Sequence, residues 1–431
     1  MKWLKIAGGV VVGLALAIFA LMGLLYATRG TPTSAVRAFG DPAGPPAAAD
    51  SVFTESLELL THTDVEDGHI VEFMYDGNHT YPRFFSDLNS ARKSITMQMY
   101  YCEAGIIADS VKNILTRKAG QGVRVLLLLD AFGSTLSKEW EDSLRSRGVR
   151  VAQFRPVKWY TLHKAGNRSH IRITVVDDSV AWTGGLGIAD KWLGDGHHDE
   201  QWRDTNVRFS GPSVAQMQAA FATAWAEATG ELMTGRLLFA AAGTQQATGA
   251  RAGLLYTTPS PGSTAAERYY ALMIAGARRT LYISNAYFVP DDDMQRFLVA
   301  AAKRGVDVRV LTAGPLTDVR SVRHAGHKVY ERLLRGGVRI FEFQPAMLHA
   351  KALSVDGVWA GVGTMNFDNR SIAFNDEAIL AVRDSGVTAE LDRQFQDDLR
   401  HSNEFKLETF GKRSVREKLL DWACSKLAKV L

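Results

Sequence analysis

Residues 348–377 read LHAKALSVDGVWAGVGTMNFDNRSIAFNDE, and this stretch decides the expected fold. It contains His349, Lys351 and Asp356 in the pattern HxKxxxxD, followed by Gly363–Asn366. The alternation after His349 predicts a strand, on which side chains two residues apart point to one face, so the imidazole and the ammonium would lie together. Histidine can act as a nucleophile or general acid near neutral pH, and lysine can neutralise a phosphate. Taken alone, this triplet would be assigned to an ordinary surface strand.

A second copy of the pattern changes that interpretation. Residues 170–187 read HIRITVVDDSVAWTGGLG and contain His170, Arg172 and Asp177. Each of these three residues lies 179 positions before its counterpart in the later copy, without a gap. Two such sites, separated by the length of a domain, indicate an internal duplication. Chance is a poor explanation for two motifs in register.

These paired motifs resemble the phospholipase D superfamily, in which two HxKxxxxD motifs build one active site. The resemblance extends from about Thr80 to the C-terminus and is strongest to the bacterial cardiolipin synthase branch. The stretches that support this branch are Asn167–Arg168, Trp202–Asp204, Tyr287–Asp291 and Met347–Lys351. The paired motifs are highly specific for the superfamily and much less specific for the substrate.

The first copy departs from the family pattern at two positions. Arg172 stands where the family has lysine, and Gly187 stands where the family's GGxN pattern has asparagine. Arginine keeps the positive charge and presents a planar fork suited to bidentate phosphate contact. Because glycine at 187 removes a donor close by, we expect Arg172 to make both phosphate contacts if the first half-site is functional.

The composition allows two domains with appendages. The chain has 431 residues, of which 46% are hydrophobic, so sizeable cores can form. Its net charge of +4 neither requires nor excludes nucleic acid. The two cysteines, Cys102 and Cys424, lie far apart and lack metal-ligand spacing, so we expect free thiols.

The N-terminal residues 6–26, IAGGVVVGLALAIFALMGLLY, carry no charged side chain. As a helix they would span roughly 31 Å, which matches a bilayer core. The run is longer than the apolar region of a cleaved signal peptide, so we predict an uncleaved transmembrane anchor over residues 1–28. Two lysines precede it, whereas Arg29 and Arg37 follow it. This asymmetry slightly favours a single-pass inner-membrane protein with a cytoplasmic N-terminus.

The remaining chain shows two rounds of alternating strands and helices, which argue for α/β layers. The clearest expected strands are Ser94–Tyr101, Val123–Asp130, Thr280–Asn285 and Val306–Thr312, and the clearest helices are Ile106–Ala119 and Asp292–Arg304. We expect a flexible linker over residues 29–50, a first repeat over 51–240, an inter-repeat linker over 241–262 and a second repeat over 263–431. With the resemblance, this order implies an α/β fold. Two phospholipase D-type repeats, each a mixed sheet flanked by helices, would pack about a pseudo-dyad. One N-terminal transmembrane helix would precede them in the chain.

Three further features have alternative explanations. The stretch Lys412–Leu431 is expected to form a basic amphipathic helix that either lies in a lipid interface or packs on the catalytic domain. His197, His198 and Asp199 could bind a metal, although a polar loop explains them better. His324 and His327 share a helix face, which is either solvated or captures anions at the mouth of the site.

Phosphodiester exchange needs a nucleophile, a proton donor and cations around the phosphoryl oxygens. One repeat supplies one histidine, so His170 and His349 would have to flank one phosphorus for in-line displacement. We expect covalent catalysis, in which one histidine becomes a phosphohistidine and the other protonates the leaving alcohol and then activates the acceptor. In the family the N-terminal histidine is often the nucleophile, which favours His170 in that role and His349 as general acid and base.

The histidines need acceptors for their second ring nitrogens, and the resemblance pairs Glu377 with Asp204 as candidates for this role. Asp177 and Asp356 are expected to anchor the turn after each motif strand. The complete candidate catalytic set is His170, His349, Arg172, Lys351, Asp177, Asp356, Asp204 and Glu377, and the candidate phosphate ligands are Arg172, Lys351, Asn366 and Thr364.

Three functions are open at this point. The first is phosphatidyl transfer between two phosphatidylglycerols, which gives cardiolipin and glycerol. The second is the same chemistry with water as acceptor or nucleic acid as donor, as in a phospholipase D, phosphodiesterase or nuclease. The third is a lipid-binding module whose first half-site is disabled by Arg172 and Gly187. The resemblance implies no metal and no cofactor. The expected partners are a phospholipid substrate and a membrane, and no nucleic acid is expected. The oligomeric state stays open.

Overall fold

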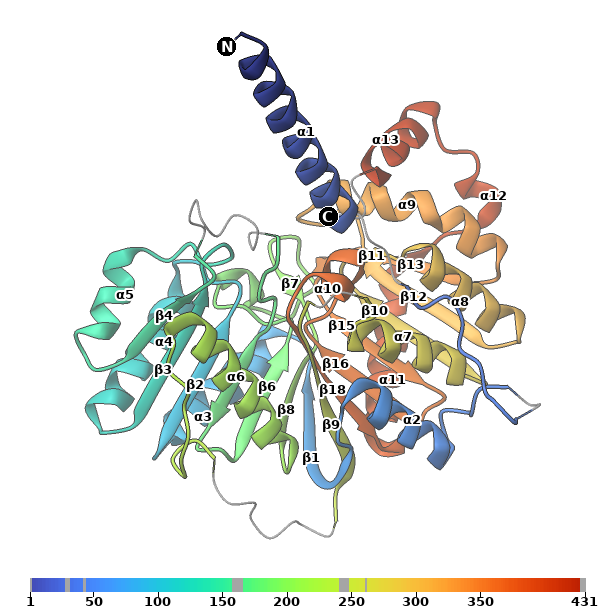
Figure 1. The fold of residues 1–431 in the computed structure, drawn as a ribbon. Coiled ribbons are helices and arrows are strands. Elements are labelled where there is room, and N and C mark those ends of the chain that lie inside the picture. The colour runs from blue at the N-terminus through green and yellow to red at the C-terminus, as the bar shows by residue number, and fades with distance from the viewer. Residues whose placement is uncertain are drawn as a thin grey trace.

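The computed structural model describes residues 2–27, 32–41, 44–156, 166–239, 248–259 and 262–426 (Figure 1). Several predicted segments fall partly outside the described residues. These parts are residues 28–31 and 42–43 in the predicted anchor and flexible linker, and residues 240–247 and 260–261 in and beside the predicted inter-repeat linker. Residues 427–431 of the predicted C-terminal helix also lie outside.

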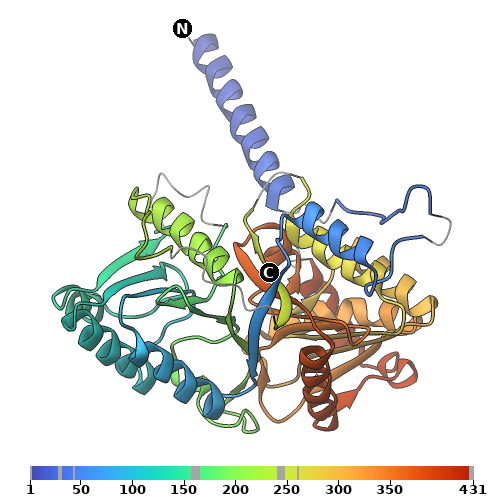
Figure 2. The same ribbon diagram turned by 90° about the horizontal axis from the view of Figure 1, so that it is seen from below.

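The N-terminal apolar run forms a single helix, α1 (Lys2–Ala27). Its segment Gly8–Leu25 has a mean hydropathy of 2.5, and none of this segment is buried against the rest of the chain. Figures 1 and 2 show the helix standing clear of the folded body. The helix is therefore long and apolar enough to cross a membrane, as the sequence predicts.

Fifteen of the described strands form one mixed sheet, in which two halves repeat the same order. In the first repeat this order is β4 (Arg150–Phe154), β3 (Arg124–Asp130), β2 (Ser94–Met99), β5 (Ile173–Val176), β6 (Val180–Gly184), β8 (Asn206–Ser210) and β1 (Glu66–Met74). In the second repeat it is β13 (Arg339–Phe343), β12 (Asp307–Ala313), β10 (Thr280–Asn285), β15 (Lys351–Val355), β16 (Trp359–Gly363), β18 (Glu377–Arg383) and β9 (Ala250–Thr257), with β19 (Ser402–Glu404) beside β13.

Both halves of the sheet are mixed in the same way. Strands β2, β3 and β4 run parallel, as do β10, β12 and β13, whereas the motif strands β5 and β15 pair antiparallel with β2 and β10. Helices connect the parallel strands, as such crossovers require. The predicted α/β class with two phospholipase D-type repeats is confirmed.

Helices cover both faces of each half-sheet. In the first repeat these helices are α3 (Gly77–Ser90), α4 (Ile106–Gly120), α5 (Lys138–Arg145) and α6 (Ser213–Thr229), and in the second they are α7 (Ala265–Gly276), α8 (Asp292–Lys303), α9 (Arg320–Arg335) and α11 (Ser385–Arg400). In the apolar strand β3, Leu127 packs with α3 and α4, whereas Leu126 and Leu128 pack with α6. Burial on both faces explains why this strand reads as a continuous apolar run.

The two repeats meet through an edge and through a face. At the edge, β1 and β9 pair antiparallel and join the half-sheets (Figure 1). At the face, Ala181 and Phe209 of the first repeat share one apolar core with Val362 and Leu380 of the second. The motif strands of both repeats therefore lie close to the pseudo-dyad.

One segment of the predicted inter-repeat linker is a central strand. Residues 250–257, within the predicted linker 241–262, form β9 between β1 and β18. The composition was misleading because the strand needs small side chains: a Cβ atom at Gly253 would lie 2.5 Å from the carbonyl oxygen of Asp64. Glycine in a strand often marks such a close backbone approach.

The start of the catalytic body also differs from the predicted boundaries. Helix α2 (Ser51–Thr61), assigned by sequence to the first repeat, packs on α7 of the second, where Phe53 contacts Trp359 with ring centroids 5.9 Å apart. Just before it, the backbone N–H of Ala48 donates to the Gly276 carbonyl at 2.9 Å, and the Ala48 carbonyl accepts from Trp359 Nε1 at 2.8 Å. The end of the predicted flexible linker is thus anchored on the second repeat.

Candidate active site

Each motif histidine lies two or three residues before its strand, at a point where backbone bonds cross between the repeats. The short strand β7 (Trp202–Arg203) pairs with β14 (Met347–Leu348), and an isolated bridge joins Ser169 to Asp376. The N–H of His349 donates to the carbonyl of Arg203 at 2.6 Å, and the N–H of His170 donates to that of Asp376 at 3.1 Å. Each histidine is therefore fixed to the opposite repeat through its backbone.

The side chains repeat this crossing. Nδ1 of His170 lies 3.0 Å from Oε1 of Glu377, and Nδ1 of His349 lies 2.8 Å from Oδ2 of Asp204. Both histidines are at most 7% exposed, and both carboxylates are at most 1% exposed. A carboxylate on Nδ1 selects the tautomer that leaves Nε2 with its lone pair.

The motif cations take equivalent positions in the two half-sites. Nη1 of Arg172 donates to the carbonyl of His170 at 3.0 Å, and Nζ of Lys351 donates to the carbonyl of His349 at 2.5 Å. Arg172 Nη1 also lies 3.3 Å from His170 Nε2. Arg172 therefore places its charge beside the ring nitrogen that Glu377 leaves free.

Burial and mutual repulsion set the ionisation of these cations and histidines. Burial, with the charge of Arg172, lowers the pKa of Lys351 to about 7. Burial also lowers the pKa of both histidines, with further lowering from Arg172 and Lys351 at His170 and from Lys351 at His349. Because Arg172 acts on Lys351 and Lys351 acts on His170, the two half-sites form one electrostatic unit.

The two carboxylates differ in their ionisation. Burial raises the pKa of Glu377 to about 8. Burial opposes ionisation of Asp204 as well, but the interaction with His349, the charge of Lys351 and the N–H of Trp192 outweigh it, so the pKa of Asp204 lies below its ordinary value. At neutral pH, Asp204 is thus an anion beside its histidine.

The motif aspartates accept hydrogen bonds from backbone N–H groups. Asp177 accepts from the N–H groups of Arg92, Lys93 and Ser94 at 2.7–2.9 Å, and Asp356 accepts from those of Arg278, Arg279 and Thr280 at 2.7–2.9 Å. Both aspartates have positive φ angles of 54–55°. Each fixes the chain that enters the strand beside its motif strand, so these two members of the candidate catalytic set have structural contacts in the described residues.

Of the predicted phosphate ligands, Thr364 has a different contact from the one expected. Its hydroxyl donates to Oε2 of Glu377 at 2.5 Å and accepts from the N–H of Ala378 at 3.0 Å. Its proton is therefore directed at the carboxylate rather than at a phosphate. Asn366 is 4% exposed, and its amide oxygen has no hydrogen-bond partner among the described residues.

The glycine that replaces the family asparagine has its space filled. A Cβ atom at Gly187 would lie 2.6 Å from the ring of Trp192 and 3.0 Å from the carbonyl of Tyr101. Trp192 is 1% exposed, and its Nε1 donates to Asp204 Oδ2 at 2.8 Å. An asparagine at 187 therefore cannot enter while Trp192 keeps this position.

Aromatic side chains around the histidines were not in the predicted set. The rings of Trp202 and Trp192 lie 4.8 Å and 5.5 Å from that of His349, and the ring of Tyr100 lies 5.0 Å from that of His170. Trp202 lies in a stretch that carries the family resemblance, and Tyr100 is the penultimate residue of the predicted strand Ser94–Tyr101. Trp192 could have been found only by continuing the 179-residue offset beyond the motif.

The secondary candidates have contacts of other kinds. His324 Nδ1 lies 2.8 Å from Asp421, and His327 Nε2 lies 2.8 Å from Glu342. Arg413 also pairs with Asp421, so the ligand atoms of His324, His327 and Asp421, although within 4.8 Å of one another, are part of an ion-pair network that joins α13 (Val415–Ser425) to α9. His197 and His198 contribute to no such group among the described residues.

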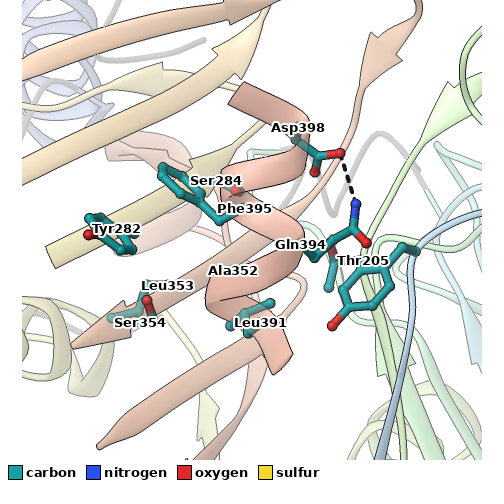
Figure 3. A pocket seen from close by; sticks show the side chains of 11 residues that line it. Thr205, Tyr282, Ser284, Ala352, Leu353, Ser354, Leu391, Gln394, Phe395 and Asp398 are labelled. Carbon is teal, nitrogen blue, oxygen red and sulfur yellow. Dashed lines mark hydrogen bonds between the residues drawn. The ribbon is translucent and has the colours of Figure 1, made fainter. Parts of the chain in front are cut away.

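A small cavity lies beside α11, apart from the motif residues (Figure 3). Figure 3 shows Gln394 and Asp398 hydrogen-bonded at its wall, with Ser284 and Ser354 on the strands. The space open to the centre of a water molecule is about 10 Å³, which is room for about one water. A phospholipid headgroup does not fit there.

Comparison with known proteins agrees with this geometry. Residues 84–225 and 270–399 match the family model described as "Cardiolipin synthase, PLD-like domain". The chain belongs to this phospholipase D-like family. The cardiolipin synthase of Geobacillus kaustophilus strain HTA426 is 34% identical over 359 residues, which cover 83% of this chain and 71% of that protein. Cardiolipin synthase 2 of Bacillus anthracis is 32% identical over 348 residues, which cover 80% and 68%.

Solved structures support the fold of this phospholipase D-like enzyme. The phosphatidylserine synthase of Haemophilus influenzae Rd KW20 superposes with a TM-score of 0.67 at 13% identity, covering 89% of this chain and all of the other. The family membership and the paired half-sites together identify an enzyme of the phospholipase D type, as the motifs predicted. The resemblance stated from the sequence is confirmed.

Proposed function

We propose that the enzyme joins two phosphatidylglycerols into cardiolipin with release of glycerol, through a phosphohistidine on His170. The observation that carries this proposal is the crossed pair of histidines, each held by a buried carboxylate of the other repeat. Such a pair supplies a nucleophile and a proton carrier to one phosphorus. The names of the relatives support the choice of cardiolipin as product.

His170 is suited to the nucleophilic role. Its Nδ1 faces Glu377, so Nε2 carries the lone pair that would attack phosphorus, and burial keeps the ring neutral by lowering its pKa. The bond from Nε2 to phosphorus forms while the bond from phosphorus to the glycerol oxygen breaks. In its ionised form, Glu377 stabilises the ring as the ring acquires positive charge.

His349 is suited to carry the proton. Its partner Asp204 has a pKa below the ordinary value, so an anion stands beside the ring and stabilises the imidazolium. In the first step His349 would act as the imidazolium, stabilised by the Asp204 anion and by the negative charge of the bound phosphodiester, and would give its Nε2 proton to the departing glycerol oxygen. In the second step it would take the proton from a glycerol hydroxyl of the second phosphatidylglycerol, whose oxygen attacks phosphorus and frees His170.

Arg172 and Lys351 would hold the phosphoryl oxygens. Both are buried, so their charges act with little screening, and each already donates to the backbone carbonyl of a reacting histidine. Arg172 keeps a cation in the first half-site, which supports an active half-site over a disabled one. Asn366 remains a candidate for a neutral contact from the second repeat.

We also propose a membrane orientation for the enzyme. Helix α1 would span the inner membrane with a cytoplasmic N-terminus, as the lysines before it favour. On α13, Val415, Leu419 and Trp422 are spaced as one helical stripe and are 84%, 62% and 50% exposed. Arg416 and Lys418 flank this stripe, which is the pattern of a helix that lies in an anionic lipid surface. Figure 1 shows α13 on the same side of the body as α1.

Two assays test the proposed reaction. Expression in cells that lack cardiolipin should restore cardiolipin in the total lipid. The purified full-length enzyme in mixed micelles with phosphatidylglycerol should form cardiolipin and glycerol in equal amounts. Phosphatidic acid without cardiolipin would instead identify a hydrolase, and lipid binding without turnover would identify a binding module.

A further inference from the structure

The 179-residue offset between the repeats continues beyond the motifs. Strands β6 and β16 obey it at both ends. The first residue of the 3₁₀ turn η2 (Asp190–Trp192) lies 179 residues before the first residue of the short helix α10 (Asn369–Ala373). Gly187 therefore corresponds to Asn366, and Trp192 corresponds to Ser371.

A second correspondence concerns the donors on the two carboxylates. Thr364 donates its hydroxyl to Glu377 in the second half-site, and its counterpart in the first is Gly185. No side chain fits at 185, because a Cβ atom there would lie 2.1 Å from Oδ1 of Asp204. The first half-site must therefore obtain its side-chain donor from elsewhere.

Trp192 supplies that donor. Its Nε1 donates to Oδ2 of Asp204 at 2.8 Å, and the same oxygen lies 2.8 Å from Nδ1 of His349. Its ring occupies the space that a side chain at 187 would need. A hydrogen bond to the acceptor oxygen restricts where the carboxylate can point, and thereby where the histidine ring is held.

From these contacts we propose that Trp192 is a positioning residue, which gives Asp204 the side-chain donor that Thr364 gives Glu377 in the second half-site. Its ring also fills the space beside Gly187, so Gly187 and Trp192 together stand where the second half-site has Asn366 and Ser371. The indole N–H fixes Asp204, and Asp204 fixes the tautomer and orientation of His349. The effect of Trp192 on turnover rests on the proposed transfer function. Its effect on the orientation of His349 does not.

The test compares two buried indoles with the same chemistry. Trp192→Phe removes the N–H on Asp204, and the matched control Trp182→Phe removes the N–H that Trp182 donates to Asp87 Oδ2, also at 2.8 Å. Because a hydrogen bond to a charged group is lost, we expect kcat of Trp192→Phe to fall about 10- to 100-fold. KM should change little, since Arg172 and Lys351 are untouched. The control should retain kcat.

A second measurement does not depend on turnover. In enzyme labelled with ¹⁵N-histidine, the ring signals of His349, assigned by their loss in His349→Ala, should report a fixed Nδ1–H tautomer in the wild type and in Trp182→Phe. In Trp192→Phe the tautomers should average. If the wild-type enzyme makes no cardiolipin, the proposed function fails while this spectrum still decides the positioning role. A wild-type kcat with an unchanged His349 signal in Trp192→Phe would overturn it.

The correspondence of Gly187 and Trp192 with Asn366 and Ser371 is tested by placing the residues of the second half-site in the first. Gly187→Asn alone should lose activity because it meets the Trp192 ring, and Trp192→Ser alone should lose it because a cavity opens and the donor is gone. The double variant Gly187→Asn/Trp192→Ser should be at least about tenfold more active than either single variant, as coupled neighbours require. A double variant no better than the poorer single one would show that the pairs are not equivalent.

Discussion

Glu377 of the second repeat holds Nδ1 of His170 of the first at 3.0 Å, although 207 residues separate them in the chain. The converse bond, from His349 to Asp204, spans 145 residues. A repeat alone has a histidine without its acceptor and a carboxylate without its donor. The candidate active site is therefore complete only at the junction of the two repeats.

The division of labour between the histidines can be tested with an activated lipid. A phosphatidyl ester of p-nitrophenol needs no proton donor for its leaving group, so His349→Ala should still form the covalent intermediate and then stall for lack of a base. We expect mass spectrometry of this variant to find a phosphatidyl group on His170. His170→Ala should release no burst of p-nitrophenol. A label found on His349 in His170→Ala would reverse the two roles.

The pKa of Lys351, lowered to about 7 by burial and Arg172, predicts pH-dependent phosphate binding. A bound phosphodiester anion favours the charged lysine, so binding raises this pKa. Affinity should be highest below pH 7 and fall, by up to about tenfold per pH unit, as the pH rises through the pKa of the free enzyme. Ionisation of Glu377, whose pKa is raised to about 8, weakens anion binding in the same direction.

The measurement is the inhibition constant of a water-soluble phosphodiester between pH 5.5 and 9, because a diester does not titrate in this range. Lys351→Arg should abolish the fall in affinity near pH 7, since arginine stays charged throughout. The fall near pH 8, which comes from Glu377, should remain. An affinity that is flat with pH in the wild type would contradict the predicted role of Lys351.

Arg172→Lys should impair the enzyme even though it restores the residue of the family pattern. Arginine Nη1 reaches both the carbonyl and Nε2 of His170, and a lysine offers no planar fork to bind a phosphate at the same time. We expect kcat/KM to fall about tenfold in Arg172→Lys and about 10²- to 10³-fold in Arg172→Ala. Transfer rates in mixed micelles measure both.

Because Gly187 lacks the donor of the family asparagine, the sequence alone would predict that Gly187→Asn rescues part of this loss. The structure predicts the opposite, because the Trp192 ring occupies the space beside Gly187. Arg172→Lys/Gly187→Asn should therefore be less active than Arg172→Lys alone. Recovery in this double variant would show that Trp192 leaves its place without cost.

The stripe on α13 predicts contact with lipid. In full-length enzyme reconstituted into anionic vesicles, with Cys424→Ser, a nitroxide label at Leu419→Cys should collide more often with lipid-soluble oxygen than with a water-soluble nickel complex. A label at Lys138→Cys, an exposed position at the N-terminus of α5, serves as the matched control and should show the reverse. Equal behaviour of the two labels would place α13 in water.

Local pattern alone determined much of this protein. Two HxKxxxxD-type motifs in register predicted the duplication, and the alternation of apolar runs predicted strands such as β3 and β10 and helices such as α4 and α8 within about two residues. These predictions succeed because side-chain periodicity and capping are encoded within a few neighbouring residues. The charge and type of the central site residues follow from the same motifs.

Only the tertiary structure decided which groups meet. The offset of 179 fails for Asp204 and Glu377, which lie 173 residues apart, so arithmetic could not match each carboxylate to a histidine. The central strand β9 was missed because its small residues, needed under a close backbone contact, resemble those of a linker. Contacts across the pseudo-dyad, such as His170 with Glu377 and His349 with Asp204, depend on how two distant strand ends pack, and no local period in the chain records that.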